Sequence, residues 1–275
     1  MEYKRILTIQ DISCVGQCSL TVALPILSAC GIETAILPSA VLSTHTAGFS
    51  GFTFRDLTDD MPAIQTHWQK EGIRFDGIYT GYLGSTKQVG YVRNILTTMG
   101  KENAVRIVDP AFADNGKLYP IFDDAYVDAM KTLCPAADVL LPNITEACFL
   151  AGKEYRETYD ENYIQDLLAS LATLGCSTIV LTGVSYAQEK TGVVVYERGK
   201  IRYYEHRWIA KGCHGTGDVY ASAFTGAVLR GNSLFDAARI AADYTVRCIE
   251  NTQDDPAHWY GVKFEGVLPD LIQML

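Results

Sequence analysis

The sequence has no long apolar run and few basic residues, and each absence argues against a class of protein. No stretch approaches the roughly 18 consecutive apolar residues of a membrane-spanning helix, and the N-terminus lacks the hydrophobic region of a secretory leader. Lys and Arg number 23 against 32 Asp and Glu, which gives a formal net charge of −9. Nucleic-acid surfaces need clustered positive charge. We therefore expect a cytoplasmic protein that binds neither membranes nor nucleic acid.

The cysteine spacing of a zinc site or a disulfide framework is also missing. The eight cysteines are scattered, mostly within apolar segments, and no Cys-x-x-Cys pair occurs. This pattern is typical of reduced thiols in a protein core. Cys14 and Cys18 in an early loop, and Cys213 in a glycine-rich loop, are the candidates for another role.

Two common phosphate-binding motifs do not occur. No Gly-x-x-x-x-Gly-Lys-Ser/Thr segment is present, which excludes a P-loop. The glycine cluster Gly215-Thr-Gly-Asp218 has Tyr220 where a dinucleotide-binding fingerprint has its third glycine, and it lies late in the chain rather than after the first strand. A nucleotide, if bound, must be held in another way.

What is present is a regular alternation of short apolar runs with helical patterns along 275 residues. This alternation predicts an α/β fold whose mainly parallel sheet is covered by helices on both faces. No repeat, low-complexity segment or linker interrupts it, so we expect one domain over residues 1–275. The predicted strands are 4–10, 32–37, 75–80, 104–108, 138–142, 177–181 and a hairpin of 192–197 with 200–206. The predicted helices are 20–30, 60–69, 85–99, 119–133, one opening at 143, 162–174, one from the glycine cluster to 231, 234–250 and a possible last one at 267–275.

The segment from residue 209 to residue 231 is the most informative. Gly215 and Gly217 permit backbone angles closed to other residues and the close approach of a ligand. The small and apolar residues that follow predict a helix, whose first N–H groups lack partners and lie at the positive end of its dipole. Asp218 then has two interpretations. It is an ordinary N-terminal carboxylate, or it accepts a hydroxyl proton while the loop amides hold a phosphoryl group.

Gly215-Thr-Gly-Asp218, after Gly-Cys-His, resembles the anion hole and catalytic base of the ribokinase-like superfamily, and most of all its pyridoxal and pyridoxamine kinases. Three further segments resemble that family in the same order, and together they cover nearly the whole chain: Thr44-His-Thr, Asp109-Pro and Pro142-Asn-x-x-Glu146. The resemblance implies a ribokinase-like three-layer α/β/α fold. It also implies transfer of the γ-phosphoryl group of ATP to the 5′-hydroxymethyl group of a B6 vitamer, with Mg²⁺, by a homodimer.

The resemblance implies a nucleotide side in which Asp109 and Glu146 hold magnesium largely through water. Other roles remain open: Asn143 and Glu146 have the spacing of a capping box, and Lys211 is equally consistent with a solvent-exposed residue. Asp114 matches a second acidic position, but Asp-Asn-Gly is also a common turn. The implied nucleotide residues are Asp109, Asn143, Glu146, Thr182, Lys211, Gly215, Thr216 and Gly217.

The resemblance also implies a pocket for the acceptor. Asp11 stands where the family usually has serine, and we expect it to pair with a protonated ring nitrogen of the substrate; a loop carboxylate is the alternative. His45 is expected to form hydrogen bonds rather than to act as a base, and Tyr82 to contact the substrate or to pack on the core. The Cys213 thiol could form a hemithioacetal with an aldehyde substrate. The implied acceptor residues are Asp11, His45, Thr46, Tyr82, Cys213 and Asp218.

Three other functions remain open. Kinases of hydroxymethylpyrimidine, a thiamin precursor, share the fold but usually have cysteine where Asp218 stands, so the aspartate favours a B6 substrate. A sugar kinase would have an early acidic Gly-Gly pattern, which is missing here. A catalytically silent binding protein would not need both Asp218 and Glu146.

Overall fold

The computed structural model describes residues 3–210 and 213–275. The strands of its main sheet are β1 (Arg5–Ser13), β2 (Glu33–Leu42), β3 (Phe54–Asp56), β4 (Phe75–Thr80), β5 (Gly100–Val108), β8 (Val139–Leu140), β9 (Thr178–Val184), β10 (Lys190–Glu197) and β11 (Lys200–Arg207). A separate hairpin consists of β6 (Ala113–Asp114) and β7 (Lys117–Leu118). The helices are α1 (Leu20–Ala29), α2 (Met61–Lys70), α3 (Thr86–Thr98), α4 (Asp124–Lys131), α5 (Ile144–Ala151), α6 (Glu161–Ala172), α7 (Thr216–Leu229), α8 (Leu234–Thr252) and α9 (Leu268–Met274).

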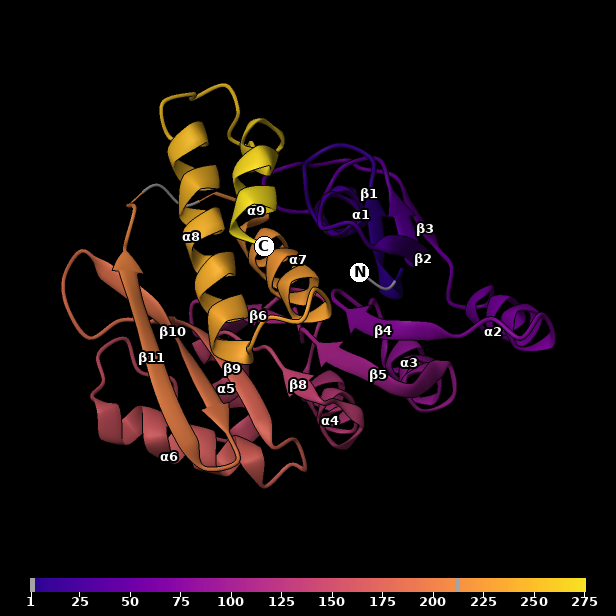
Figure 1. The fold of residues 1–275 in the computed structure, drawn as a ribbon, viewed down its shortest axis with the longest axis horizontal. Coiled ribbons are helices and arrows are strands. Elements are labelled where there is room, and N and C mark those ends of the chain that lie inside the picture. The colour runs from indigo at the N-terminus through magenta and orange to yellow at the C-terminus, as the bar shows by residue number, and fades with distance from the viewer. Residues whose placement is uncertain (1–2, 211–212) are drawn as a thin grey trace.

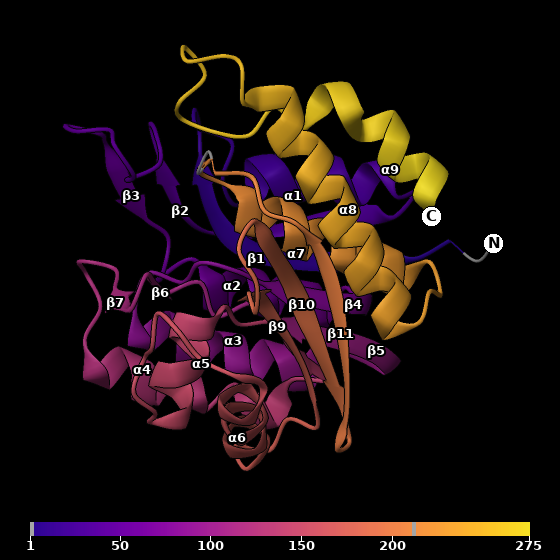
Figure 2. The same ribbon diagram turned by 90° about the vertical axis from the view of Figure 1, so that its left-hand side faces the viewer.

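The main sheet has the strand order β11-β10-β9-β8-β5-β4-β1-β2-β3. The pairs from β9 to β2 are parallel, and the outer strands β10, β11 and β3 pair antiparallel. Helices cover both faces (Figures 1 and 2). Buried residues of α2 to α6 form one apolar layer, and those of α1, α7, α8 and α9 form the other. The expected α/β fold with a mainly parallel central sheet is therefore confirmed.

Local signals in the sequence located several elements well. The predicted strand 75–80 matches β4, and Ser85 caps α3 by accepting a hydrogen bond from the backbone of Gln88. The hairpin predicted at 192–197 and 200–206 is formed by β10 and β11, and the helix predicted at 267–275 is α9. Within the described residues, no helix has both the length and the apolar character needed to cross a membrane.

Several predicted element boundaries were wrong, and one hairpin was not predicted. The strand expected to end before Asp11 continues to Ser13, because β1 stays paired with β2 as far as Leu42. The helix expected from residue 119 begins only at Asp124, where the Asp123 carboxylate accepts a hydrogen bond from the Tyr126 backbone N–H. The residues before it contain the β6–β7 hairpin, which was not predicted.

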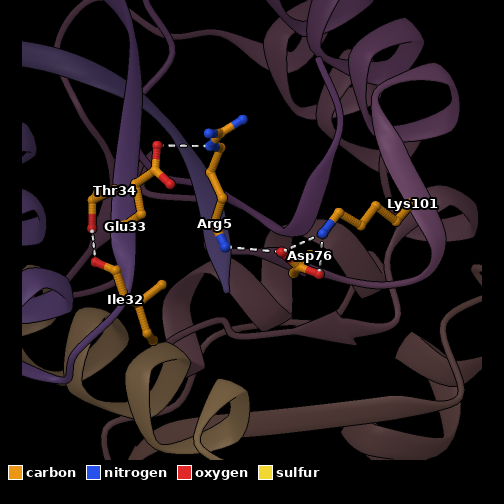
Figure 3. A network of polar contacts seen from close by, with 6 residues as sticks. All are labelled: Arg5, Ile32, Glu33, Thr34, Asp76 and Lys101. Atoms are coloured by element: carbon orange, nitrogen blue, oxygen red, sulfur yellow. Dashed lines mark hydrogen bonds and ion pairs between the residues drawn. The ribbon is translucent and has the colours of Figure 1, made fainter. Parts of the chain in front are cut away.

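Ion pairs join the strands at the amino-terminal edge of the parallel sheet (Figure 3). The backbone N–H of Arg5 donates to Asp76 at 2.8 Å, and Lys101 Nζ donates to both oxygens of the same carboxylate at 2.8 and 2.9 Å. Arg5 Nε also pairs with Glu33 Oε1 at 2.7 Å. These contacts connect β1, β2, β4 and β5. Partly exposed pairs of this kind contribute about 0–1 kcal/mol each, so their role is in strand alignment.

Candidate active site

The opposite, carboxyl-terminal edge of the sheet carries the acidic residues that the sequence analysis singled out. Asp11 lies near the end of β1, and Asp109 directly follows β5. Asp218 joins them from the first turn of α7. Open α/β sheets bind ligands beyond the carboxyl ends of their strands, so these residues mark the candidate site.

The glycine loop enters α7 with two glycines that meet different surroundings. Gly215 is the N-cap residue and has φ 80°, a left-handed conformation. A Cβ added there would lie 2.2 Å from the carbonyl oxygen of Gln17. At Gly217 a Cβ would meet no other protein atom within 4 Å. Gly215 is thus required for the contact between two loops, whereas Gly217 leaves open space at the start of the helix.

No side chain from the N-cap position satisfies the first amides of α7, so they remain able to bind an anion. The backbone N–H of Ser19 instead lies close enough to the Asp218 carboxylate to favour its ionised form. This carboxylate keeps some accessible surface while protein surrounds it on most sides. Burial raises its pKa to about 7, and the nearby Asp11 carboxylate adds to the shift. A base with a pKa near 7 is well matched to proton transfer at neutral pH.

The loop that supplies the Ser19 amide has an unusual backbone. Gln17 and Ser19 have φ values of 52° and 55°, which are rare for residues with a side chain. Such conformations cluster at functional sites. Cys18, between them, has its thiol pKa raised by burial and by the charges of Asp218 and Asp11. The sequence analysis had noted Cys18 only as a cysteine of an early loop, and its place beside two carboxylates was not predicted.

The structure gathers most of the expected acceptor residues around Asp11. Its carboxylate is buried and accepts a hydrogen bond from Ser13 Oγ at 2.9 Å, and burial raises its pKa. The Tyr82 hydroxyl has its pKa raised by burial and by the Asp11 charge. His45 is buried and influences Asp11 electrostatically. Thr46, in contrast, is exposed.

On the other side of the glycine loop the half-buried Cys213 accepts, at its carbonyl oxygen, a hydrogen bond from Thr216 Oγ1 at 3.3 Å. Lys211, an expected phosphate ligand, lies outside the described residues.

A cleft of about 760 Å³ opens beside the N-terminus of α5. Its lining includes the expected Asn143 and Thr182 and the weaker candidate Asp114. The sequence analysis did not predict its aromatic members, which are Tyr155, Tyr159 and Trp208. These rings are contributed by segments far apart in the chain, so a single sequence offered no signal that would group them.

Asn143 and Glu146 form the capping box that their spacing indicated. Asn143 Oδ1 accepts from the Glu146 backbone N–H at 2.9 Å, and Glu146 Oε2 accepts from the Asn143 backbone N–H at 2.9 Å. Glu146 Oε1 accepts from the Phe112 backbone N–H at 3.0 Å. Each carboxylate oxygen keeps a further lone pair. Glu146 therefore caps α5, and this capping role leaves its negative charge available for binding a cation.

Asp109 and Glu146 are buried carboxylates at one site. Burial raises the pKa of Glu146 to about 7. The pKa of Asp109 is raised well above its ordinary value by burial, and by the like charges of Glu146 and Asp218. Bringing further negative charge to these acids, such as a nucleotide phosphate, is unfavourable unless a cation accompanies it.

Magnesium fits this set of donors. Carboxylate oxygens are its preferred protein ligands, and Mg²⁺ usually keeps several of its waters. Among the described residues, no group of three or more His, Cys, Asp and Glu side chains has the arrangement needed to hold a metal ion directly. The expected magnesium site at Asp109 and Glu146, held largely through water, stays a prediction.

Comparisons with known proteins show which proteins the chain resembles. A family model described as phosphomethylpyrimidine kinase matches residues 24–261. A crystal form of a Bacteroides thetaiotaomicron protein, described as a phosphomethylpyrimidine kinase and containing pyridoxal, is 36% identical, with 98% of this chain and 96% of that chain covered and a TM-score of 0.92. The pyridoxal kinase from Lactobacillus plantarum is 31% identical over 99% and 98% of the two chains, with a TM-score of 0.92. A Bacillus subtilis hydroxymethylpyrimidine/phosphomethylpyrimidine kinase is 24% identical, covering 78% of this chain and 77% of its own.

Proposed function

Because the chain belongs to the phosphomethylpyrimidine kinase family, whose relatives include pyridoxal kinases, we propose that it phosphorylates a B6 vitamer. The reaction transfers the γ-phosphoryl group of ATP to the 5′-hydroxymethyl group of pyridoxal, pyridoxamine or pyridoxine. The observation that carries the proposal is the position of Asp218. Its carboxylate stands in the first turn of α7, beside helix amides that no N-cap side chain caps, and close enough to Asp11 for the two charges to interact.

In the proposed mechanism Asp218 accepts the proton of the substrate hydroxyl. A pKa of about 7 is still far below that of an alcohol, so proton transfer comes late, when the phosphoryl group has largely left ATP. The amides of residues 215–218, with Gly217 leaving room, bind the charge that develops on the moving group. Asp11 orients the acceptor ring, and His45, Thr46, Tyr82 and Cys213 line its pocket.

The nucleotide is assigned to the cleft lined by Asn143 and Thr182, with Thr216 toward its phosphates. Its volume of about 760 Å³ lies in the range of small-molecule sites. When bound, Mg²⁺ would neutralise phosphate charge. Asp109 and Glu146 would hold its waters, and their raised pKa values fall again once a cation is present, because it favours the ionised form.

A second candidate function is phosphorylation of hydroxymethylpyrimidine. The description of the matching family and the Bacillus relative both favour it. The chemistry is the same, since each acceptor is a planar nitrogen heterocycle that carries a hydroxymethyl group. We rank it second because the chain has an aspartate at 218, and because the more similar Bacteroides relative has been crystallised with pyridoxal.

The test is ADP release measured with each of the three vitamers and with hydroxymethylpyrimidine under identical conditions. We expect turnover with at least one vitamer at a kcat/KM at least tenfold above that for hydroxymethylpyrimidine. The reverse ranking supports the second candidate, and no turnover with any of the four contradicts both. A single domain over residues 1–275, a homodimer and a cytoplasmic location complete the proposal, and light scattering of the purified protein checks the dimer.

A further inference from the structure

The loop that follows α8, residues 253–261, packs on a loop from the opposite end of the chain. The Phe49 ring packs against the Trp259 ring in a tilted arrangement, with ring centroids 4.8 Å apart, and the Tyr260 ring lies 6.3 Å from the same phenylalanine. His45 contacts Phe49 edge to face at 5.0 Å. About 210 residues of sequence separate these partners, so their contact closes a large part of the fold on itself.

His45 is the polar connection between the two loops. Its Nε2 lies 2.6 Å from the carbonyl oxygen of Tyr260, and its Nδ1 accepts a hydrogen bond from the backbone N–H of Ala47 at 3.1 Å. Nδ1 is thus the acceptor, and Nε2 must carry the proton that is donated to Tyr260. With both nitrogens engaged and the side chain buried, the ring is fixed in one tautomer and one orientation. It has no nitrogen free to act as a base.

Glycines stand where these side chains meet the backbone. A Cβ at Gly48, which has φ 81°, would lie 2.7 Å from the Trp259 ring. A Cβ at Gly16, which has φ 129°, would lie 2.0 Å from the His45 ring. Gly261 approaches the carbonyl oxygen of Gly16 in the same way, at 2.7 Å from its added Cβ. Three loops are therefore in close contact, which leaves little freedom in how the loop 253–261 lies.

This assembly adjoins the candidate site. The His45 ring lies 5.4 Å from the ring of His214, two residues before the helix that carries Asp218. His45 also lies close enough to buried Asp11 to influence its carboxylate. Trp259 remains 47% exposed although Phe49 covers part of it. The free aromatic surface thus stands near the acceptor residues and apart from Trp208, which lines the nucleotide cleft.

From this arrangement we propose that residues 253–261 form an outer wall of the acceptor pocket, and that His45 positions this wall rather than acting on the substrate. Trp259 and Phe49 offer apolar aromatic surface at the mouth of the pocket, which suits a planar heterocycle and not a sugar. The wall confers selectivity for the acceptor ring and takes no part in nucleotide binding. The inference rests on the proposed function for the place of the acceptor, and it extends that function by assigning Trp259 and His45 their roles.

The first test is the variant Trp259→Ala, with the KM of the acceptor and the KM of ATP measured separately. We expect the acceptor KM to rise at least fivefold, since aromatic contacts contribute strongly to binding, while the KM of ATP changes less than twofold. Trp208→Ala is the matched control, because it removes the other highly exposed tryptophan, at 53%. Trp208→Ala should raise the KM of ATP and leave the KM of the acceptor nearly unchanged. An unchanged acceptor KM in Trp259→Ala overturns the proposal.

The positioning role of His45 is tested by a double-mutant cycle. His45→Ala should raise the acceptor KM, with kcat falling less than tenfold, and adding Trp259→Ala should cause little further increase, because both changes release the same wall. His45→Gln keeps an N–H donor for the Tyr260 carbonyl and should recover part of the loss. Fully additive effects, or a loss of kcat as large as that of an Asp218 variant, contradict the role assigned to His45.

A measurement without turnover separates this inference from the proposed function. In Trp208→Phe protein, the remaining emission comes from Trp68 and Trp259, and Trp68 packs against Phe75 in another part of the fold. Pyridoxine should change this emission and ADP should not, whereas Trp259→Phe protein should show the opposite response. If the vitamers are not phosphorylated but pyridoxine still changes Trp259 emission, the role of residues 253–261 in the acceptor pocket is supported and the proposed reaction is wrong. If they are phosphorylated and the emission does not change, the wall is wrong.

Discussion

Gly215 packs against the carbonyl oxygen of Gln17, with room for a hydrogen atom and for nothing larger. An added Cβ would come to 2.2 Å from that oxygen. The contact joins the loop before α1, whose Ser19 N–H lies near the Asp218 carboxylate, to the loop that begins α7, which carries Asp218 itself. This close backbone contact therefore helps to align the candidate base with the Ser19 amide.

We predict that Gly215→Ala impairs catalysis as well as stability. Alanine at φ 80° costs about 1–2 kcal/mol for the left-handed conformation alone, and the clash with Gln17 forces the two loops apart. Asp218 then loses its alignment, so kcat should fall at least a hundredfold. Thermal unfolding and steady-state ADP release measure the two effects.

Gly217→Ala is the matched control for that variant. The added Cβ meets nothing within 4 Å. The unfolding temperature should therefore stay within about 2 °C of wild type, as expected when the free energy of unfolding changes by less than ~0.5 kcal/mol. If a phosphoryl group approaches the backbone there, activity should fall in spite of an intact fold. Full activity in Gly217→Ala would show that the open space at 217 is not used by the substrates.

Asp218→Asn should lower kcat by about 10²–10⁴, the usual contribution of a general base, and leave ATP binding nearly intact. A second consequence follows from its pKa, which burial raises from 3.8 to about 7. Between these values the folded protein binds a proton that the unfolded chain has lost, so stability falls as the pH rises through 7. Asparagine cannot ionise. The variant should therefore gain stability relative to wild type as the pH rises from 5 to 8.

Thermal unfolding at several pH values measures this gain, and kcat/KM of the wild type should rise with pH along a limb near 7. Asp128→Asn serves as the control, because this carboxylate is exposed and paired with Lys131 on α4. The stability of Asp128→Asn relative to wild type should not increase as the pH rises from 5 to 8. Retention of more than about a hundredth of wild-type activity in Asp218→Asn contradicts the assignment of the base.

The sequence predicted those parts of the site that depend on neighbours along the chain. The capping box of Asn143 and Glu146 and the glycine turn before Asp218 are local patterns, and both are present. The amphipathic repeat likewise indicated the layers of the fold. The late start of α4 also had a local signal, the pair Asp123-Asp124, which supplies its cap, but the apolar residues before it suggested a longer helix.

Contacts between distant segments could not be predicted in this way. The length of β1, and with it the position of Asp11 inside a strand, is set by pairing with β2, as in the register of Ile12 with Val41. Trp259 reaches Phe49 across most of the chain. One sequence states which residues are aromatic or acidic, and only the folded backbone decides which of them meet.

Magnesium should stabilise the protein more at pH 8 than at pH 6. Glu146, with a pKa of about 7, is largely protonated at pH 6 and largely ionised at pH 8, where its charge acts against that of Asp109, whose pKa is raised partly by this like charge. A cation held through their waters relieves that repulsion and competes with protons for the site. Unfolding temperatures with and without Mg²⁺ at the two pH values measure the effect.

Glu146→Gln is the sharpest control for the magnesium effect. Glutamine removes the charge, and its one oxygen can still accept from the Asn143 backbone N–H and keep the capping box, but its amide nitrogen then faces the Phe112 backbone N–H. The Mg²⁺-dependent stabilisation should then be at least halved, and stability in the absence of the metal should fall by about 1–3 kcal/mol because that buried N–H loses its acceptor. Glu146→Ala should in addition destabilise the protein by about 0.5–2 kcal/mol, through loss of the cap. An unchanged Mg²⁺ effect in Glu146→Gln would exclude Glu146 from the metal site.

The Asp11 carboxylate should make the binding of a B6 vitamer depend on pH. It is buried, and burial raises its pKa, so ionised Asp11 is costly unless a positive charge faces it. A protonated ring nitrogen supplies that charge, and the pair then shares one proton. Asp11→Ser, which introduces the residue usual in pyridoxal kinases, should weaken binding most near pH 6, where more of the ring nitrogen is protonated, and least near pH 9.

Calorimetric titration of pyridoxine into wild type and into Asp11→Ser over pH 6–9 measures the ratio of their affinities for the vitamer. Ser13→Ala is the control, because it removes the hydroxyl that donates to Asp11 at 2.9 Å and leaves the carboxylate in place. Its affinity should change less than that of Asp11→Ser and should keep the pH dependence of the wild type. A constant ratio between wild type and Asp11→Ser across the range would mean that the carboxylate does not face the ring nitrogen, and that its burial serves only the end of β1.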